Sequence, residues 1–220
     1  MPEILYEDKY IYVIKKPAGL PVQTASLMTK DLVSEMKNYR ASKGEDPYIG
    51  LVNRLDQPVS GVLVLGKDKK TTDSLSAQIR EKTAGKEYLA KVTWKEGKSQ
   101  LKPGDTGELK DFLLKDGKTN TSKVVKEGTK GAKAARLTYK VLEADETSAL
   151  VRVFLDTGRH HQIRVQFSNA GYPLVGDKKY GCEAGNMEKN ICLACVMFSF
   201  THPVTKKEMK FEVEPDFLYT

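Results

Sequence analysis

Residues Asn53–Gly66, NRLDQPVSGVLVLG, join a polar loop to the most uniformly apolar short run of the chain. Residues 61–66 are apolar or glycine at every position, which is typical of a central strand buried on both faces. The loop before them places Asp56 among Arg, Pro and Gly at the edge of this strand. Taken alone, such a loop is explained by a turn with an exposed Arg–Asp pair, which contributes little to stability. The alternative is a functional carboxylate at the strand edge.

Strands and helices are predicted on both sides of this segment. The predicted strands cover residues 4–6, 10–14, 61–66, 87–94, 137–143, 149–155, 191–201 and 208–213. The predicted helices cover 29–43, 72–82 and 160–170, with Thr29 capping the first, Asp73 near the start of the second, Asp156 or Thr157 capping the third, and Gly171 ending it. No repeat and no Gly/Ser linker interrupts the pattern. We therefore expect one domain over residues 1–220, of the α+β class, with a mixed, mainly antiparallel sheet and flanking helices.

Residues 95–135 differ in composition from the rest of the chain. They contain ten Lys against six acidic residues, with six Gly and one Pro. We expect two or three exposed strands with long polar loops here. The segment is either a solvated excursion or an arm that faces RNA.

The overall composition is that of a globular protein with a basic surface. Of 220 residues, 40% are hydrophobic and 30% charged, and 36 basic against 29 acidic residues give a net charge of +7. This excess favours a polyanionic partner, although scattered lysines also serve as a solubilising surface. No apolar run is long enough for a membrane span, and the acidic N-terminus does not resemble a signal peptide. We expect a cytoplasmic protein without membrane contact.

Two further groups of residues could carry chemistry. Cys192 and Cys195 have CxxC spacing, but on a strand their side chains would point to opposite faces, so we expect buried core cysteines rather than a metal site. Residues 157–164, TGRHHQIR, open the third helix with cationic side chains, and a helix N-terminus beside Arg and His can bind an anion. Adjacent His160 and His161 on a helix would face different ways, which argues against joint metal ligation.

Five motifs follow one another along the chain. They are ILYEDKYIYVIKKPAGLPV (4–22), NRLDQPVSG (53–61), KEYLAKV (86–92), GRHHQIRVQFSNAGYPLVGDKKYG (158–181) and FTHPVTKKEMKFEVEPDF (200–217). In this order they resemble the motifs of the RluA-type pseudouridine synthases, which isomerise uridine in structured RNA. The resemblance covers nearly the whole chain. It implies the pseudouridine synthase catalytic fold, and we expect the catalytic domain only, without the helical RNA-binding domain that precedes it in many relatives.

The sequence departs from the family's central pattern, His-Arg-Leu-Asp-x-x-Thr-Ser-Gly, at two positions. Asn53 stands in place of the His, and Val59 in place of the Thr. Asn53 keeps a short polar side chain but has no titratable ring. Because Asp56, Tyr88 and Arg164 are retained, we expect a working enzyme. The alternative is a catalytically silent RNA-binding protein of the same fold.

The resemblance also implies roles for individual residues. Asp56 would be the essential carboxylate, acting as a nucleophile at sugar or base, or as the base that removes a sugar proton. Arg164 would pair with it, and Tyr88 would offer a flat face to the uracil. Arg54 would fill the space that the extruded uridine leaves.

Further substrate contacts are expected from Lys16, Arg159 and His161. The resemblance implies no metal and no cofactor. The expected partner is ribosomal RNA rather than transfer RNA, and we expect the protein to be a monomer.

Overall fold

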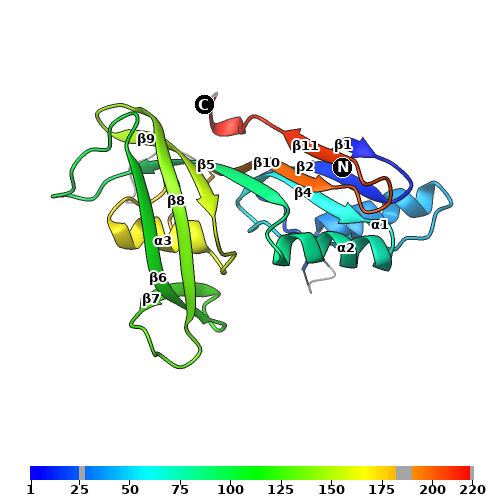
Figure 1. Ribbon diagram of the computed structural model, residues 1–220, viewed down its shortest axis with the longest axis horizontal. Coiled ribbons are helices and arrows are strands. Elements are labelled where there is room, and N and C mark those ends of the chain that lie inside the picture. The colour runs from blue at the N-terminus through cyan, green and yellow to red at the C-terminus, as the bar shows by residue number, and fades with distance from the viewer. Residues whose placement is uncertain (25–27, 182–189, 219–220) are drawn as a thin grey trace. The chain divides into compact units, whose positions relative to one another are not determined.

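The computed structural model describes residues 1–24, 28–181 and 190–218. The chain divides into two compact units (Figure 1). The first comprises Met1–Lys86 with Ala194–Thr220, and the second comprises Glu87–Leu193. The predicted single domain over residues 1–220 stays a prediction.

The first unit contains a sheet with the strand order β1-β2-β4-β10. Its strands are β1 (Glu3–Glu7), β2 (Ile11–Lys16), β3 (Gly50–Leu51), β4 (Ser60–Gly66), β10 (Leu193–Thr201) and β11 (Glu208–Glu212), and a 3₁₀ turn, η1, covers Asp216–Leu218. β11 pairs with β10, and β3 pairs with β4. All pairs are antiparallel except β4 with β10. Every residue of β4 is buried, as its apolar run predicted.

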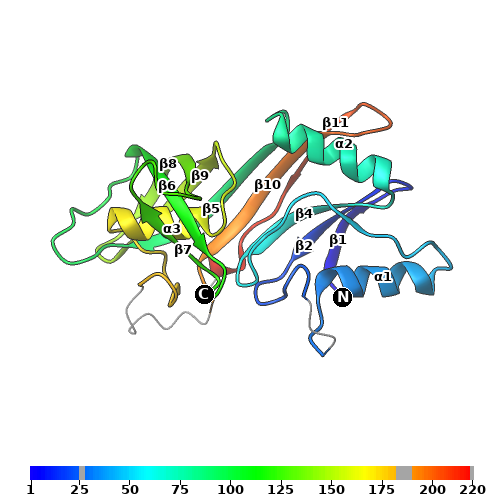
Figure 2. The ribbon, with the colours of Figure 1, turned by 90° about the horizontal axis from the view of Figure 1, so that it is seen from below.

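Two helices flank this sheet: α1 (Leu32–Ser42) and α2 (Lys69–Arg80). The ring of Tyr39 on α1 lies 6.2 Å from that of Tyr12 on β2. Leu75 on α2 packs in one cluster with Val13 and Val64. Because Tyr12 and Val13 point to opposite faces of the strand, the two helices pack on opposite faces of the sheet (Figure 2).

Both helices begin at other residues than the sequence predicted. Asp31 caps α1, where its Oδ1 accepts a hydrogen bond of 2.7 Å from Ser34 N, so Thr29 as the cap was wrong. Asp68 caps α2 and accepts from Thr71 N at 2.8 Å, so the helix begins at Lys69, three residues before the predicted start at residue 72. Polar residues form the first turn of α2, and the apolar periodicity on which the prediction rested begins only after them.

Gly61 ends the NRLDQPVSG motif because neighbouring backbone comes too close for a side chain. Its φ is +121°, and a Cβ at this position would lie 2.1 Å from the carbonyl oxygen of Cys195. Gly61 pairs with Cys195 in the parallel register of β4 and β10. Glycine is the residue that tolerates both conditions. The motif therefore includes a structural residue beside the candidate chemical ones.

The second unit is an antiparallel sheet with the order β5-β9-β8-β6-β7. Its strands are β5 (Gly85–Thr93), which begins in the first unit, β6 (Thr106–Asp116), β7 (Thr121–Val125), β8 (Lys133–Ala144) and β9 (Ser148–Leu155). The Lys-rich residues 95–135 thus supply β6, β7 and the start of β8, which confirms the predicted exposed strands.

Helix α3 (Gln162–Ala170) packs on this sheet, with Val165 against Leu113 and Ala135 (Figure 1). The helix ends at Gly171, which has a φ of +91° as predicted. Its start differs from the prediction. His161 occupies the N-cap in the left-handed conformation, with a φ of +54° and no hydrogen bond from its side chain to the helix. Asp156 and Thr157 as caps were therefore wrong.

The strand pairing and the three helices confirm the α+β class and the mainly antiparallel pairing. Cys192 and Cys195 are both fully buried, as predicted for core cysteines. None of the helices in the described ranges is long and apolar enough to cross a membrane.

Candidate active site

The loop between β3 and β4 alternates buried and exposed side chains. Leu55 and Val59 point into the first unit and are buried, whereas Arg54 is exposed and Asp56 half-buried. Val59 N donates to the carbonyl oxygen of Asp56 at 3.0 Å, which closes a turn directly after the carboxylate. The apolar side chains therefore anchor a loop that presents Arg54 and Asp56 at its surface. Val59 contributes to this anchoring by burial, although it lacks the hydroxyl of the family's Thr.

Lys16 fastens this loop to the first motif. The side chain is fully buried at the end of β2, and its Nζ donates to the carbonyl oxygens of Pro17 (2.8 Å), Leu20 (2.8 Å) and Gln57 (3.0 Å). Gly19 N adds a backbone hydrogen bond of 2.9 Å to the same oxygen of Gln57. The residue after Asp56 is thus held by the residues that follow β2.

The charge of Lys16 is linked to that of Asp56. Burial lowers the pKa of Lys16 to about 8, and the negative charge of Asp56 acts in the opposite direction. The structure shows Lys16 in contact with carbonyl oxygens of its own unit. Its predicted contact with substrate stays a prediction.

Asn53 occupies the position of the family's His and is buried. Its Oδ1 accepts a hydrogen bond of 3.1 Å from the backbone N–H of Val64 in the middle of β4. Its Nδ2 makes no hydrogen bond with the described residues. A ring nitrogen of His can also accept a hydrogen bond. The observed contact therefore needs an acceptor at residue 53 rather than a titratable group.

Arg54, unlike Lys16, is not held by polar contacts. Its side chain is exposed, and it makes no hydrogen bond or ion pair with any residue that the structure describes. Nothing in the first unit holds the guanidinium in one place. It can therefore reach a substrate without breaking an existing contact.

Tyr88 lies on β5 opposite Val153 of β9, and its side chain is mostly buried. The next residues on either side, Glu87 and Leu89, point to the other face of the sheet. Glu87 is occupied there by an ion pair with Arg152, whose NH1 lies 3.5 Å from its Oε2. The ion pair of Glu87 therefore lies on the opposite face of the strand from Tyr88.

Arg164 lies in the first turn of α3 and forms a buried ion pair with Asp177. Its Nε donates to Oδ2 and its NH2 to Oδ1 of Asp177, both at 2.8 Å, with side-chain exposures of 6% and 1%. This two-pronged geometry matches the planar guanidinium to a carboxylate. The predicted pairing of Arg164 with Asp56 concerns residues of different units and stays a prediction.

Tyr180 completes the surroundings of Arg164. Its ring centroid lies 5.0 Å from the guanidinium carbon, within the range of a cation–π contact. The phenol oxygen accepts from Ser122 N at 2.8 Å and lies 2.6 Å from His161 Nδ1. His161 is thus held in its left-handed conformation beside α3, which carries Arg164 and is called the arginine helix below.

His160 and His161 do not lie on a helix, so the geometric argument against joint metal ligation was wrong in its premise. They form the turn before α3, and their rings stack with centroids 3.7 Å apart. The left-handed backbone of His161 turns the two side chains to the same side. The described residues nevertheless contain no group of three or more His, Cys, Asp or Glu side chains that could hold a metal ion.

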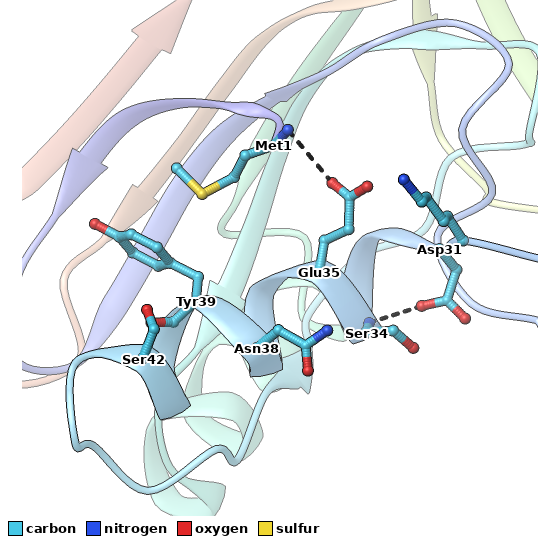
Figure 3. A pocket seen from close by; sticks show the side chains of 8 residues that line it. Met1, Asp31, Ser34, Glu35, Asn38, Tyr39 and Ser42 are labelled. Atoms are coloured by element: carbon cyan, nitrogen blue, oxygen red, sulfur yellow. Dashed lines mark hydrogen bonds and ion pairs between the residues drawn. The ribbon is translucent and has the colours of Figure 1, made fainter.

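A cavity of about 430 Å³ lies elsewhere in the first unit, along α1 (Figure 3). Its lining comprises Met1, Lys30, Asp31, Ser34, Glu35, Asn38, Tyr39 and Ser42. Asp31 is engaged in the helix cap, and Glu35 lies 3.8 Å from the N-terminal amino group. None of the predicted site residues lines this cavity.

Asp177 and Tyr180 are the two residues whose importance the sequence analysis missed. Both lie in the motif 158–181, in its closing segment GDKKYG (176–181), so the motif itself contained them. What the sequence did not indicate was that this turn folds back onto the first turn of α3 and provides the partners of Arg164.

Known proteins match this chain along most of its length. The model of the RNA pseudouridylate synthase family matches residues 10–169. The chain is 35% identical over 221 residues to the ribosomal large subunit pseudouridine synthase C of Salmonella typhimurium and to that of Escherichia coli. Each alignment covers 97% of this chain and 66% of the relative, so the chain spans just under two thirds of their length. This chain belongs to the RNA pseudouridylate synthase family.

Solved structures show the same fold. Human RNA pseudouridylate synthase domain containing 4 superposes with a TM-score of 0.75 at 24% sequence identity, over 99% of this chain and 90% of that one. Human RNA pseudouridylate synthase domain containing 1 superposes with a TM-score of 0.73 at 22% identity, over 99% and 84%. The α+β arrangement predicted from the sequence is therefore that of pseudouridine synthase structures.

Proposed function

We propose that this chain isomerises uridine to pseudouridine in ribosomal RNA. The observation that carries the proposal is the family match over residues 10–169, which includes Asp56, Tyr88 and Arg164. Relatives at 35% identity are named for the large ribosomal subunit, which supports ribosomal rather than transfer RNA. The net charge of +7 suits a polyanionic substrate.

The reaction is an isomerisation, so its atoms and electrons balance within the substrate. The C1′–N1 bond breaks, the uracil turns, and a C1′–C5 bond forms. The C5 hydrogen leaves as a proton, and N1 gains a proton. The protein must therefore bind and orient a uridine, stabilise the separated state and move these protons.

Asp56 is the group to which we assign the chemistry. It acts as a nucleophile at the sugar or base, or as the base that removes a sugar proton. The buried anchors Leu55 and Val59 and the Lys16 hydrogen bond to Gln57 hold the loop that presents this carboxylate. Such positioning supports catalysis because a preorganised group needs no rearrangement in the transition state.

We assign supporting roles to four residues of the second unit. Tyr88 offers a flat face for the uracil and a hydroxyl for proton transfer at C5. Arg164, held by Asp177 and Tyr180, supplies a fixed positive charge. Arg159 is exposed and lies close to the arginine helix, where it can contact substrate, and His161 fixes the turn between them.

Arg54 has the properties needed for extrusion of the target uridine. It is exposed and makes no hydrogen bond or ion pair with the described residues. A uridine in folded RNA must leave its stack before a carboxylate can act on it, which costs a few kcal/mol. A side chain that fills the vacated space lowers this cost.

The variant Asp56→Asn tests the proposal, because it removes the charge and keeps the shape. We expect tritium release from RNA labelled at uridine C5 to fall by about 100- to 10,000-fold. RNA affinity and thermal unfolding should stay close to wild type, since Asp56 is only half-buried. Turnover near the wild-type level would show that another group carries the chemistry.

The silent RNA-binding protein is the outcome that would replace this proposal. It would follow if the wild type binds RNA, isomerises no uridine in total cellular RNA, and gains activity when Asn53 is changed to His. Mapping pseudouridines at single-nucleotide resolution in cells with and without the gene gives the same decision in vivo and identifies the uridine.

A further inference from the structure

A small cationic cavity opens at one end of the β7-β6-β8 part of the second unit. Its volume is about 180 Å³, and Asp56, Tyr88 and Arg164 do not line it, whereas Arg159, expected above to contact substrate, does. Its lining comprises Leu113, Lys115, Ser122, Gly131, Lys133, Gly158, Arg159 and His160. Three cationic side chains, one hydroxyl and one imidazole thus surround a single space.

The register of the sheet brings two lysines to this space. Leu113 on β6 lies opposite Lys133 on β8, and Lys115 on β6 lies opposite Ser122 on β7. Directly opposite residues share a face, and so do residues two apart on one strand. Lys115 and Lys133 therefore project on the face that α3 covers further along the sheet (Figure 1). Gly131 also lines this space.

The turn before α3 supplies the other wall of the cavity. Arg159 Nε donates to the carbonyl oxygen of Ala134 at 2.9 Å, which fixes the guanidinium at the start of β8. The ring of His160 is held through Nδ1 by the hydroxyl of Ser122 at 2.9 Å and through Nε2 by Asn120 Oδ1 at 3.1 Å. These contacts are made before any ligand arrives, so the wall is largely preorganised.

The cavity lining contains no carboxylate. Lys115, Lys133 and Arg159 form no ion pair with the residues that the structure describes. Other cations of the same sheet are neutralised locally: Lys110 and Arg136 both pair with Glu108. The cavity therefore keeps its positive charge available for an anion from outside.

We propose that this cavity binds one backbone phosphate of the RNA substrate, an inference that rests on the proposed function. Its volume of about 180 Å³ is well above what a single water molecule needs, so a phosphate group can enter. One face of the His160 ring is covered by the ring of His161, with the two centroids 3.7 Å apart. Arg and Lys side chains are the usual partners of phosphate oxygens. A phosphate here would hold the RNA against the turn that begins the arginine helix.

The double variant Lys115→Gln/Lys133→Gln tests the proposal through the salt dependence of RNA binding. The matched control, Lys126→Gln/Lys140→Gln, removes the same charge from exposed positions of the same unit that do not line the cavity. Affinity for transcribed large-subunit ribosomal RNA is measured over a range of salt. One lost phosphate contact lowers the slope of log K against log salt by about 0.7–0.9.

We expect the slope of the double variant to fall by about 0.7–0.9, because both lysines bind the same phosphate. The slope of the control should fall by less. A loss of about 1.4–1.8, corresponding to two independent phosphates, would overturn the proposal, as would a loss equal to that of the control. A wild type that does not bind RNA would overturn the proposed function instead.

Inorganic phosphate provides a measurement that needs no RNA. Titrated into the wild-type protein, it should shift the backbone amide signals of Gly131 and Gly158 in NMR spectra. The same spectra show whether the double variant is folded. The shifts should vanish in the folded double variant and persist in the control. Phosphate that moves neither signal in the wild type, or moves both equally in the double variant, overturns the cavity as a phosphate site.

Discussion

The Asp56 loop and the arginine helix each depend on one buried cation, but the two cations are held in different ways. Lys16 places its ammonium among three carbonyl oxygens, and burial lowers its pKa to about 8. Arg164 meets a full negative charge, the carboxylate of Asp177, through two hydrogen bonds. An ammonium group surrounded by carbonyl oxygens can lose its proton, whereas a guanidinium stays charged at all accessible pH values. The first region should therefore respond to pH, and the second to loss of its partner.

The largest effect on stability is expected for Arg164→Met. The change leaves the Asp177 carboxylate, whose side chain is 1% exposed, without its counter-charge. Breaking a buried pair on one side costs about 3–5 kcal/mol of unfolding free energy. Urea unfolding measures this loss, and activity should fall with it.

The double variant Arg164→Met/Asp177→Asn serves as the control for this prediction, because it removes both charges. It should regain part of the lost stability but not the activity. Equal stability of Arg164→Met and wild type would contradict the view that Asp177 depends on Arg164.

Lys16→Met should reveal the pH response of the loop region. In the folded protein the pKa of Lys16 is about 8, below its ordinary value of 10.5. Between these two values the unfolded chain holds the proton and the folded chain does not, so unfolding free energy rises with pH. The unfolding free energy of wild type minus that of Lys16→Met should therefore grow by up to about 3 kcal/mol as the pH rises from 8 to 10.5.

Subtracting the variant's curve from that of the wild type removes the contributions of all other titrating groups. Below pH 8 the difference should be constant, since Lys16 is charged in both states. Parallel curves throughout this window would mean that the three carbonyl oxygens keep the ammonium charged.

Asn53→Ala is expected to lower the unfolding free energy by about 1–3 kcal/mol, because the buried N–H of Val64 loses its acceptor. Asn53→His keeps an acceptor, so its stability and turnover should stay closer to those of wild type. Thermal unfolding and tritium release measure the two effects. If Asn53→His raises turnover strongly, the position contributes more than an acceptor, which would favour the silent-protein alternative for the wild type.

Arg54→Ala should have the smallest effect on stability, within about 0.5 kcal/mol, because the side chain is exposed and makes no hydrogen bond or ion pair with the described residues of its unit. Its effect should lie in kcat, lowered about tenfold or more on a structured RNA and much less on a short unpaired strand. Equal losses on both RNAs would reduce Arg54 to a phosphate contact.

The regular elements were predictable because their signals are local. The apolar run of β4 and the end of α3 at Gly171 follow from the burial of a strand and from the backbone freedom of glycine. Helix starts were less predictable, since Asp31 and Asp68 act as caps through side-chain hydrogen bonds, which leave no periodic signature in the sequence. His161 could not be predicted at an N-cap, because a left-handed residue without a side-chain cap contradicts the usual preference. Its conformation is stabilised instead by Tyr180, which lies 19 residues further along the chain.

The sequence by itself determined the class of fold, the order of the strands along the chain, the family and the residues that carry its motifs. Those features depend on periodicity and on short patterns that neighbouring residues complete among themselves. The tertiary structure alone decided that Asp177 is a partner of Arg164, that Lys16 lies in a cage of carbonyl oxygens, and that lysines of β6 and β8 meet at one cavity. Arg164 and Asp177 are 13 positions apart, and Lys16 and Gln57 are 41 positions apart. At such separations the sequence does not show which oxygen a cation contacts. The packing of the chain decides it.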